Sequence, residues 1–165
     1  MTSLRYISGY SAESQQQVAQ LIDNNQLLPY LRKRYPTAHQ VHNSRALYDY
    51  TQQLKNQFIK KSPPLNKVVY DGKIVRADRA LGLHTYVGRV QGNKIKSKNE
   101  IKIAEVFKRL PLDMLKMIVV HELAHIKEKD HNKAFYQLCC HMEPRYHQLE
   151  FDTRLFLTAI DLGIN

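Results

Sequence analysis

Two histidines and a glutamate lie close together in the segment His121-Glu122-Leu123-Ala124-His125. In a helix, four residues advance by about 400°, so both imidazoles lie on one face, about 6 Å apart along the axis. Two ring nitrogens on such a face can bind one zinc ion. Glu122 is turned by about 100° from His121 and can act as a general base toward a water molecule that the metal activates. The spacing therefore predicts a metallohydrolase.

A catalytic zinc site usually has three protein ligands and a water molecule. His131 follows His125 by six residues, where charged residues are expected to end the helix. A turn at this point can bring His131 back to the ion, so we predict it as the third ligand. The alternatives are His141, Glu143 and Glu150. The expected cofactor is one zinc ion.

Apolar residues at helical spacing predict the elements that position the motif. We expect helices over about 11–24 and 44–60, from Pro111 through the motif, from Asn132 to Pro144, and over about 145–161. Prolines at positions 29 and 36 are expected to interrupt helix formation over residues 26–36.

Strand-forming residues predict a small sheet ahead of the motif. Asp71-Gly72 between two apolar segments is typical of a hairpin turn. Residues 82–90 and 94–104 are expected to form two further strands joined by a turn. Lysines alternate with isoleucines in the second of these, which predicts one solvated basic face and one buried face.

The chain has 165 residues and a net charge of +10, which is unevenly distributed. Residues 1–60 carry +4, residues 61–110 carry +8 and residues 111–165 carry −2. The basic region 61–110 suggests nucleic acid or another polyanion as a partner, although a solvated surface gives the same pattern. Ser62-Pro63-Pro64 predicts a boundary between an N-terminal helical extension (1–62) and a main domain (63–165).

Neither a membrane nor an oxidising compartment is expected. No apolar run approaches the 18 or so residues of a membrane-spanning helix. The only two cysteines, Cys139 and Cys140, are adjacent and do not indicate a disulfide scaffold. We therefore expect a cytoplasmic protein.

The segment HELAHIKEKDHNKAF (121–135) resembles the HExxH-x5-H-x3-F signature of the YgjP-like metallopeptidases and of the related WLM group. The resemblance implies a zincin-like α+β fold. In such a fold a small twisted, mainly antiparallel sheet packs on the motif helix, with N-terminal and C-terminal helices around it. It also implies that His121, His125 and His131 bind the metal, that Glu122 is catalytic, and that Phe135 packs beneath the site.

The expected function is a zinc metallopeptidase acting on a peptide or protein substrate. One alternative is a metal-dependent hydrolase of nucleotide phosphoanhydrides, because the predicted sheet is rich in lysine and some YgjP-like proteins carry a nucleotide pyrophosphatase label. Another is a DNA-associated protease, or a zinc-binding module, that uses the basic region 61–110. Residues that could contact the substrate or stabilise an oxyanion are His84, Tyr86 and Arg89 before the motif and Tyr136 and Tyr146 after it.

Overall fold

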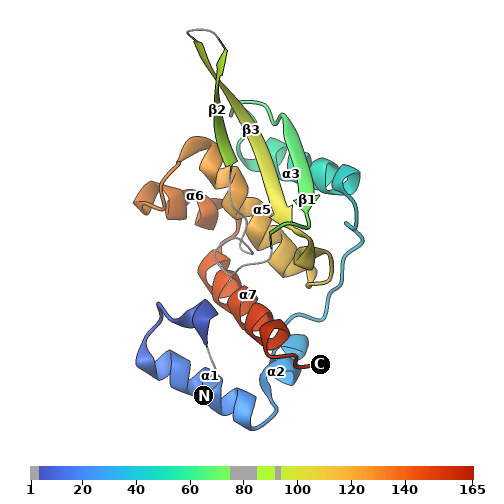
Figure 1. The fold of residues 1–165 in the computed structure, drawn as a ribbon, viewed down its shortest axis with the longest axis vertical. Coiled ribbons are helices and arrows are strands. Elements are labelled where there is room, and N and C mark those ends of the chain that lie inside the picture. The colour runs from blue at the N-terminus through green and yellow to red at the C-terminus, as the bar shows by residue number, and fades with distance from the viewer. Residues whose placement is uncertain (1–3, 75–84, 92–93) are drawn as a thin grey trace.

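The computed structural model of the chain describes residues 4–74, 85–91 and 94–165, with residues 85–91 and 94–98 described through their backbone. The described part is mainly helical and has one small sheet (Figure 1). In chain order the elements are η1 (Arg5–Ile7), α1 (Ala12–Asp23), α2 (Leu27–Arg34), α3 (Ser44–Phe58), β1 (Lys67–Asp71), β2 (Thr85–Gln91), β3 (Lys94–Ala104), η2 (Glu105–Lys108), α5 (Leu112–Lys127), α6 (Lys133–Met142) and α7 (Tyr146–Asp161).

The sheet has the strand order β1-β3-β2 and is mixed. β2 and β3 pair antiparallel, which confirms the two strands predicted before the motif. The expectation of a mainly antiparallel sheet is wrong for β1, which pairs in parallel with β3. Ile101 and Ile103 on β3 are fully buried, whereas Lys102 between them is partly exposed, so the predicted alternation holds where side chains are described.

The predicted hairpin at Asp71-Gly72 is not confirmed. The backbone N–H of Lys73 donates to the Asp71 carboxylate at 2.9 Å, which turns the chain at the end of β1. Ile74 then lies outside any strand, and Val75 lies outside the described residues. The turn residues were identified correctly, but β1 finds its described partner in the distant strand β3.

Side-chain caps explain where three of the described α-helices begin. The side chains of Ser11, Asn43 and Asn132 accept hydrogen bonds from the first turns of α1, α3 and α6. The prediction for residues 26–36 was wrong, because α2 forms there. Pro29 lies in its first turn, where a backbone N–H would have no helical partner, so proline is tolerated.

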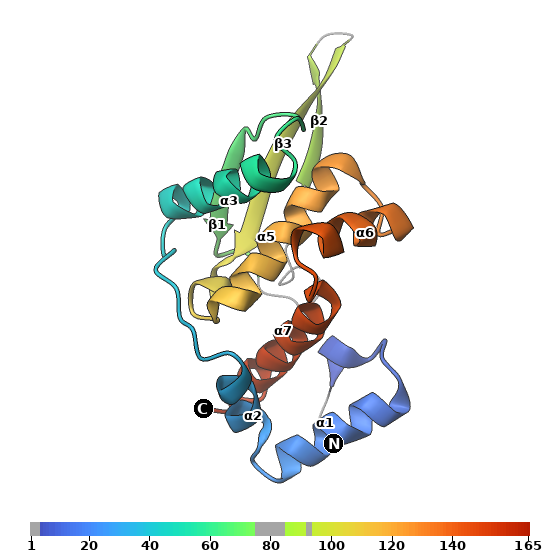
Figure 2. The same cartoon turned by 180° about the vertical axis from the view of Figure 1, so that it is seen from behind.

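Helix α5 lies at the centre of the fold. It contacts β3 on one side and α3, α6 and α7 on others, as the views from front and back show (Figures 1 and 2). Most of its side chains are buried whichever way they point, including Met114, Ile118, Val119 and Leu123, which are fully inaccessible. A helix enclosed in this way is a rigid support for polar side chains near its C-terminal end.

The N-terminal elements pack against α7, which contacts both η1 and α2 (Figure 1). The division into an extension (1–62) and a main domain (63–165) stays a prediction. Among the helices in the described ranges, none is long and apolar enough to cross a membrane.

Candidate metal centre

The three predicted histidine ligands come from α5 and from the turn that follows it. α5 carries His121 and His125 one turn apart and ends at Lys127. The chain turns through residues 128–132, and Asn132 caps α6 by accepting a hydrogen bond from the N–H of Phe135 at 2.9 Å. This turn brings His131 back over α5.

The Nε2 atoms of the three histidines converge. His125 Nε2 lies 3.2 Å from His121 Nε2 and 2.9 Å from His131 Nε2. Three nitrogens around a tetrahedral zinc ion, each at roughly 2.0–2.1 Å, are separated by about 3.3–3.4 Å. Because the ligand atoms of all three lie within 4.8 Å of one another, the histidines form a three-residue site that fits a metal ion.

The other ring nitrogen of two of these histidines is held by the protein. His121 Nδ1 lies 2.6 Å from the hydroxyl of Tyr146, the first residue of α7. His125 Nδ1 lies 2.9 Å from the backbone carbonyl of Glu128, which is the C-cap of α5. Such partners fix the orientation and tautomer of an imidazole so that Nε2 points at the metal.

The rings rest on an aromatic base. The centroid of Phe135 lies 5.0, 4.5 and 4.9 Å from those of His121, His125 and His131. Phe135 is fully buried. Burial, together with the nearby His131, lowers the pKa of His125, which favours the neutral imidazole that binds metals.

Glu122 lies beside the histidines on α5 and is fully buried. Burial raises the pKa of its carboxyl well above the usual range. A carboxylate on the same turn as two candidate metal ligands can exchange a proton with water when its pKa lies near the working pH.

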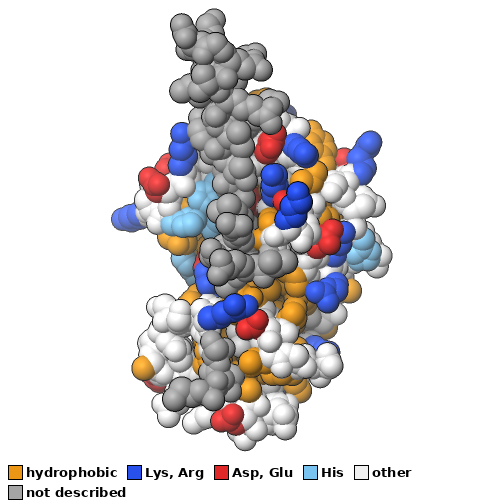
Figure 3. All heavy atoms as spheres, viewed as in Figure 1, with side chains coloured by type: hydrophobic (Ala, Val, Ile, Leu, Met, Phe, Trp, Pro, Cys, Tyr) orange, Lys and Arg blue, Asp and Glu red, His pale blue; other side chains and the backbone are white. Residues whose placement is uncertain are grey.

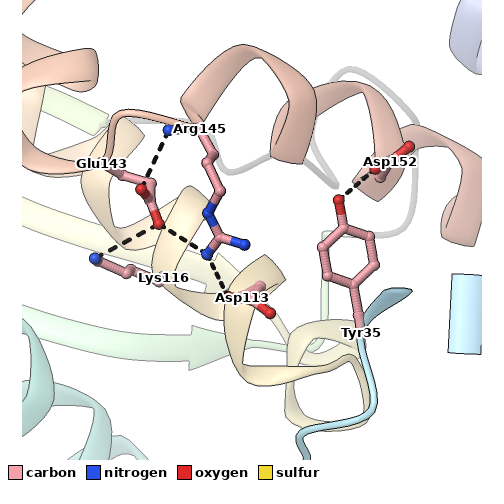
Figure 4. A network of polar contacts seen from close by, with 6 residues as sticks. All are labelled: Tyr35, Asp113, Lys116, Glu143, Arg145 and Asp152. Carbon is pink, nitrogen blue, oxygen red and sulfur yellow. Dashed lines mark hydrogen bonds and ion pairs between the residues drawn. The ribbon is translucent and has the colours of Figure 1, made fainter. Parts of the chain in front are cut away.

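A network of ion pairs and hydrogen bonds holds the connection between α6 and α7, which ends at Tyr146 (Figure 4). The Glu143 carboxylate accepts from the backbone N–H and the guanidinium of Arg145, both at 3.2 Å, and lies 3.6 Å from Lys116 Nζ. Arg145 also pairs with Asp113 at 2.7 Å. The network thus ties the connection between α6 and α7 to α5, directly before Tyr146.

Among the described residues, none of the alternative third ligands belongs to the histidine cluster. The ring of His141 packs edge-on against Phe58, with the centroids 5.7 Å apart. Glu143 belongs to the network just described, and Glu150 pairs with Arg154 at 3.2 Å.

The predicted substrate-side residues are described less fully. His84 lies outside the described residues, and Tyr86 and Arg89 are described only as backbone positions on β2. Tyr136 packs near His131, with ring centroids 6.4 Å apart. Tyr146, by contrast, contacts the candidate ligand His121 directly. This contact could not be predicted from sequence spacing, because 25 residues separate the two. Histidine side chains reach the surface over α5 and α6, with both basic and acidic side chains near them (Figure 3).

Comparison with known proteins gives two findings. Residues 92–152 match the family described as YgjP-like, metallopeptidase domain. An Escherichia coli (strain K12) protein named UTP pyrophosphatase is 59% identical over 165 residues, which is 100% of this chain and 99% of that protein. No solved structure matches.

The full-length relative corrects the expected function. The main expectation, hydrolysis of peptide bonds in a peptide or protein substrate, is wrong, because a protein 59% identical along the whole chain is a UTP pyrophosphatase. The physical reason is that the HExxH pattern determines only how metal ligands and a base are positioned on a helix. It carries no information about the substrate.

Proposed function

The chain belongs to the YgjP-like metallopeptidase domain family, and on this premise we propose that it is a metal-dependent nucleoside triphosphate pyrophosphatase acting on UTP. The observation that carries the proposal is the full-length identity of 59% to a UTP pyrophosphatase, in a chain that has three convergent histidines beside a buried glutamate. We assign His121, His125 and His131 as metal ligands and Glu122 as the general base.

The reaction is the hydrolysis of the bond between the α and β phosphates. A water oxygen attacks the α-phosphorus, the bond from this phosphorus to the bridging oxygen breaks, and pyrophosphate leaves with the bonding electrons. Glu122 takes the proton that the water loses. The products are UMP and pyrophosphate, so atoms and charge balance.

The metal that best suits the donor set is one zinc ion, since three imidazole nitrogens favour zinc over magnesium. When bound, it supplies Lewis-acid chemistry, which makes water more acidic and neutralises phosphate charge. The chain's own contribution is orientation: Tyr146 and the Glu128 carbonyl hold two of the imidazoles, and Phe135 supports all three from beneath.

The charge distribution suits a triphosphate better than a peptide. Residues 61–110 carry a surplus of +8, and part of this segment forms β3, which contacts α5. A basic segment of this kind would attract a polyanionic substrate. Tyr86 and Arg89 on β2, with His84 just before it, remain our candidates for contacting the substrate. We also propose that the sheet and α5 form a zincin-like arrangement.

A nucleotide panel tests the proposal. The purified chain is depleted of metal with a chelator, reloaded with zinc or magnesium, and incubated with UTP, CTP, ATP and GTP. We expect release of pyrophosphate from UTP that is lost on depletion and restored by reloading. If pyrophosphate is released from none of the four nucleotides with either metal, the proposal is wrong.

A further inference from the structure

A cavity of about 700 Å³ lies at the end of α5 opposite the histidines. It is open to solvent and is lined by α2, by the connection from α2 to α3, by residues 108–111 and by the end of α7 (Figures 1 and 2). Pro111 lines the cavity, and ten residues of helix, about 15 Å along the axis, separate it from His121. None of the three histidines lines the cavity.

Two arginines in this cavity differ from all others whose side chains are described. Five arginines form an ion pair with a carboxylate: Arg5, Arg34, Arg45, Arg145 and Arg154. Arg32 and Arg109 are exposed and form no ion pair with any described residue, and both line the cavity. Lys108 also lines it, and no Asp or Glu is among the described lining residues.

The cavity also has an apolar wall. Ile160 is 44% exposed, and it is the one large hydrophobic side chain in the described part of the chain that is exposed to this degree. It lines the cavity together with the buried side chains of Leu110 and Phe156. Arginines that form no ion pair with any described carboxylate, beside an exposed apolar side chain, suit a ligand that has both an anionic group and an apolar body.

The histidines of the cavity are not arranged to bind a metal. His39 is buried and uses both ring nitrogens within the protein, one toward the Phe107 carbonyl at 2.9 Å and one accepting from the N–H of Val41 at 3.0 Å. His42 is exposed, and its ring centroid lies 5.6 Å from that of His39. His39 is thus a fixed part of the wall, whereas the ring of His42 is exposed and can stack on a planar ligand.

We propose that this cavity binds a nucleoside monophosphate at a site separate from the metal centre. Arg32 and Arg109 contact the phosphate, because a guanidinium group can donate two parallel N–H bonds to phosphate oxygens. The nucleoside covers Ile160 and stacks on His42. The volume lies within the range of small-molecule sites, about 300–1,000 Å³, and exceeds what inorganic phosphate alone would fill. The choice of UMP as ligand rests on the proposed function, because that reaction releases it.

Calorimetric titration of the full-length chain with UMP, uridine and inorganic phosphate tests the proposal. We expect UMP to bind at least tenfold more tightly than either fragment. The double variant Arg32→Ala/Arg109→Ala should weaken UMP binding at least tenfold, and Arg45→Ala, which alters an exposed paired arginine, should change it less than twofold. Ile160→Glu keeps both arginines but adds a negative charge to the cavity, and it should weaken binding to a similar extent.

Three outcomes would overturn the proposal. The first is UMP binding that the arginine double variant leaves unchanged while circular dichroism shows it folded. The second is UMP binding that His131→Ala abolishes, which would place UMP at the metal centre. The third is inorganic phosphate binding as tightly as UMP, which would leave only an anion site. Arginine-dependent UMP binding in a chain that does not hydrolyse UTP would support this site and reject the proposed function.

Discussion

His121 Nδ1 lies 2.6 Å from the hydroxyl of Tyr146, so the first residue of α7 holds a candidate ligand on α5. Burial, and then the nearby charge of Glu150, raise the pKa of Tyr146, so the phenol keeps its proton. If His121 Nε2 held a metal, Nδ1 would carry the proton and could donate to the Tyr146 oxygen. In the proposed site, Tyr146 would therefore be a positioning residue that acts through His121.

Replacing Tyr146 with phenylalanine should weaken zinc binding by about 10–100-fold, because a group that orients a metal ligand typically contributes this much. The matched control is Tyr136→Phe, since Tyr136 packs near His131 by its ring. Competition titration against a chromophoric chelator measures both affinities. Equal zinc affinity in Tyr146→Phe and the unsubstituted chain would show that this hydroxyl does not orient the ligand.

Replacing Glu122 with glutamine should lower the rate of UTP hydrolysis by about 10²–10⁴-fold, the usual contribution of a general base. Zinc content should not change, because Glu122 is not one of the three assigned ligands. Glu128→Gln is the control: its backbone carbonyl, the group that contacts His125, is retained. Activity and bound metal are measured on the same preparations. A Glu122→Gln variant that turns over UTP normally would exclude this residue as the base.

Replacing His131 with alanine should reduce the bound zinc to a small fraction and remove UTP hydrolysis. His131 is exposed, so the substitution should leave the fold intact. His141→Ala is the matched control, because His141 packs against Phe58 away from the cluster. Elemental analysis after desalting distinguishes the two. Loss of zinc in His141→Ala, with zinc retained in His131→Ala, would assign the third ligand to the wrong histidine.

The network around Glu143 should make stability depend on pH. Burial alone would raise the pKa of Glu143, but the N–H of Arg145 and the positive charges of Lys116 and Arg145 outweigh it and hold the pKa below its usual value. A carboxyl whose pKa is lower in the folded state stabilises the fold above its unfolded pKa, and this contribution is lost as pH falls through the folded pKa.

Glu143→Gln should therefore lower the free energy of unfolding at pH 7 by about 1–3 kcal/mol, because it weakens the hydrogen bonds and ion pairs of a buried carboxylate. The difference from the unsubstituted chain should shrink as pH falls below about 4, the usual range of a glutamate. Asp49→Asn, which removes an exposed pair with Arg45, should cost at most about 0.5 kcal/mol. Urea unfolding from pH 3 to pH 7 measures these differences. A difference that stays constant with pH would mean that Glu143 is not ionised in the network.

The sequence predicted what depends on local signals. The caps at Ser11 and Asn132 and the apolar spacing along the chain were sufficient to place α1, α5, α6 and α7. The strands β2 and β3 followed from strand-forming residues on both sides of a turn, with alternation in β3. Helix α2 was missed, because Pro29 was taken as a break although it falls in a first turn. The parallel pairing of β1 with β3 was missed because it joins residues more than 30 apart, and a turn signal reports only local chain direction.

In the candidate site, too, the residues that depend on local spacing were predicted and those that depend on packing were not. His121, Glu122 and His125 follow from one helical spacing, and His131 followed from proximity and from the family signature. Tyr146 could not be selected among several aromatic candidates, since its contact depends on how α7 packs on α5. The substrate could not be derived from the motif, and the peptide expectation failed for this reason.

Phosphorus NMR of UTP incubated with the zinc-loaded chain in ¹⁸O-labelled water tests the proposed reaction directly. We expect UMP and pyrophosphate as products, with the label in UMP, because water attacks the α-phosphorus. Neither product should form with Glu122→Gln or with the metal-depleted chain. UDP and inorganic phosphate as products, label in pyrophosphate, or unchanged UTP would contradict the proposed reaction.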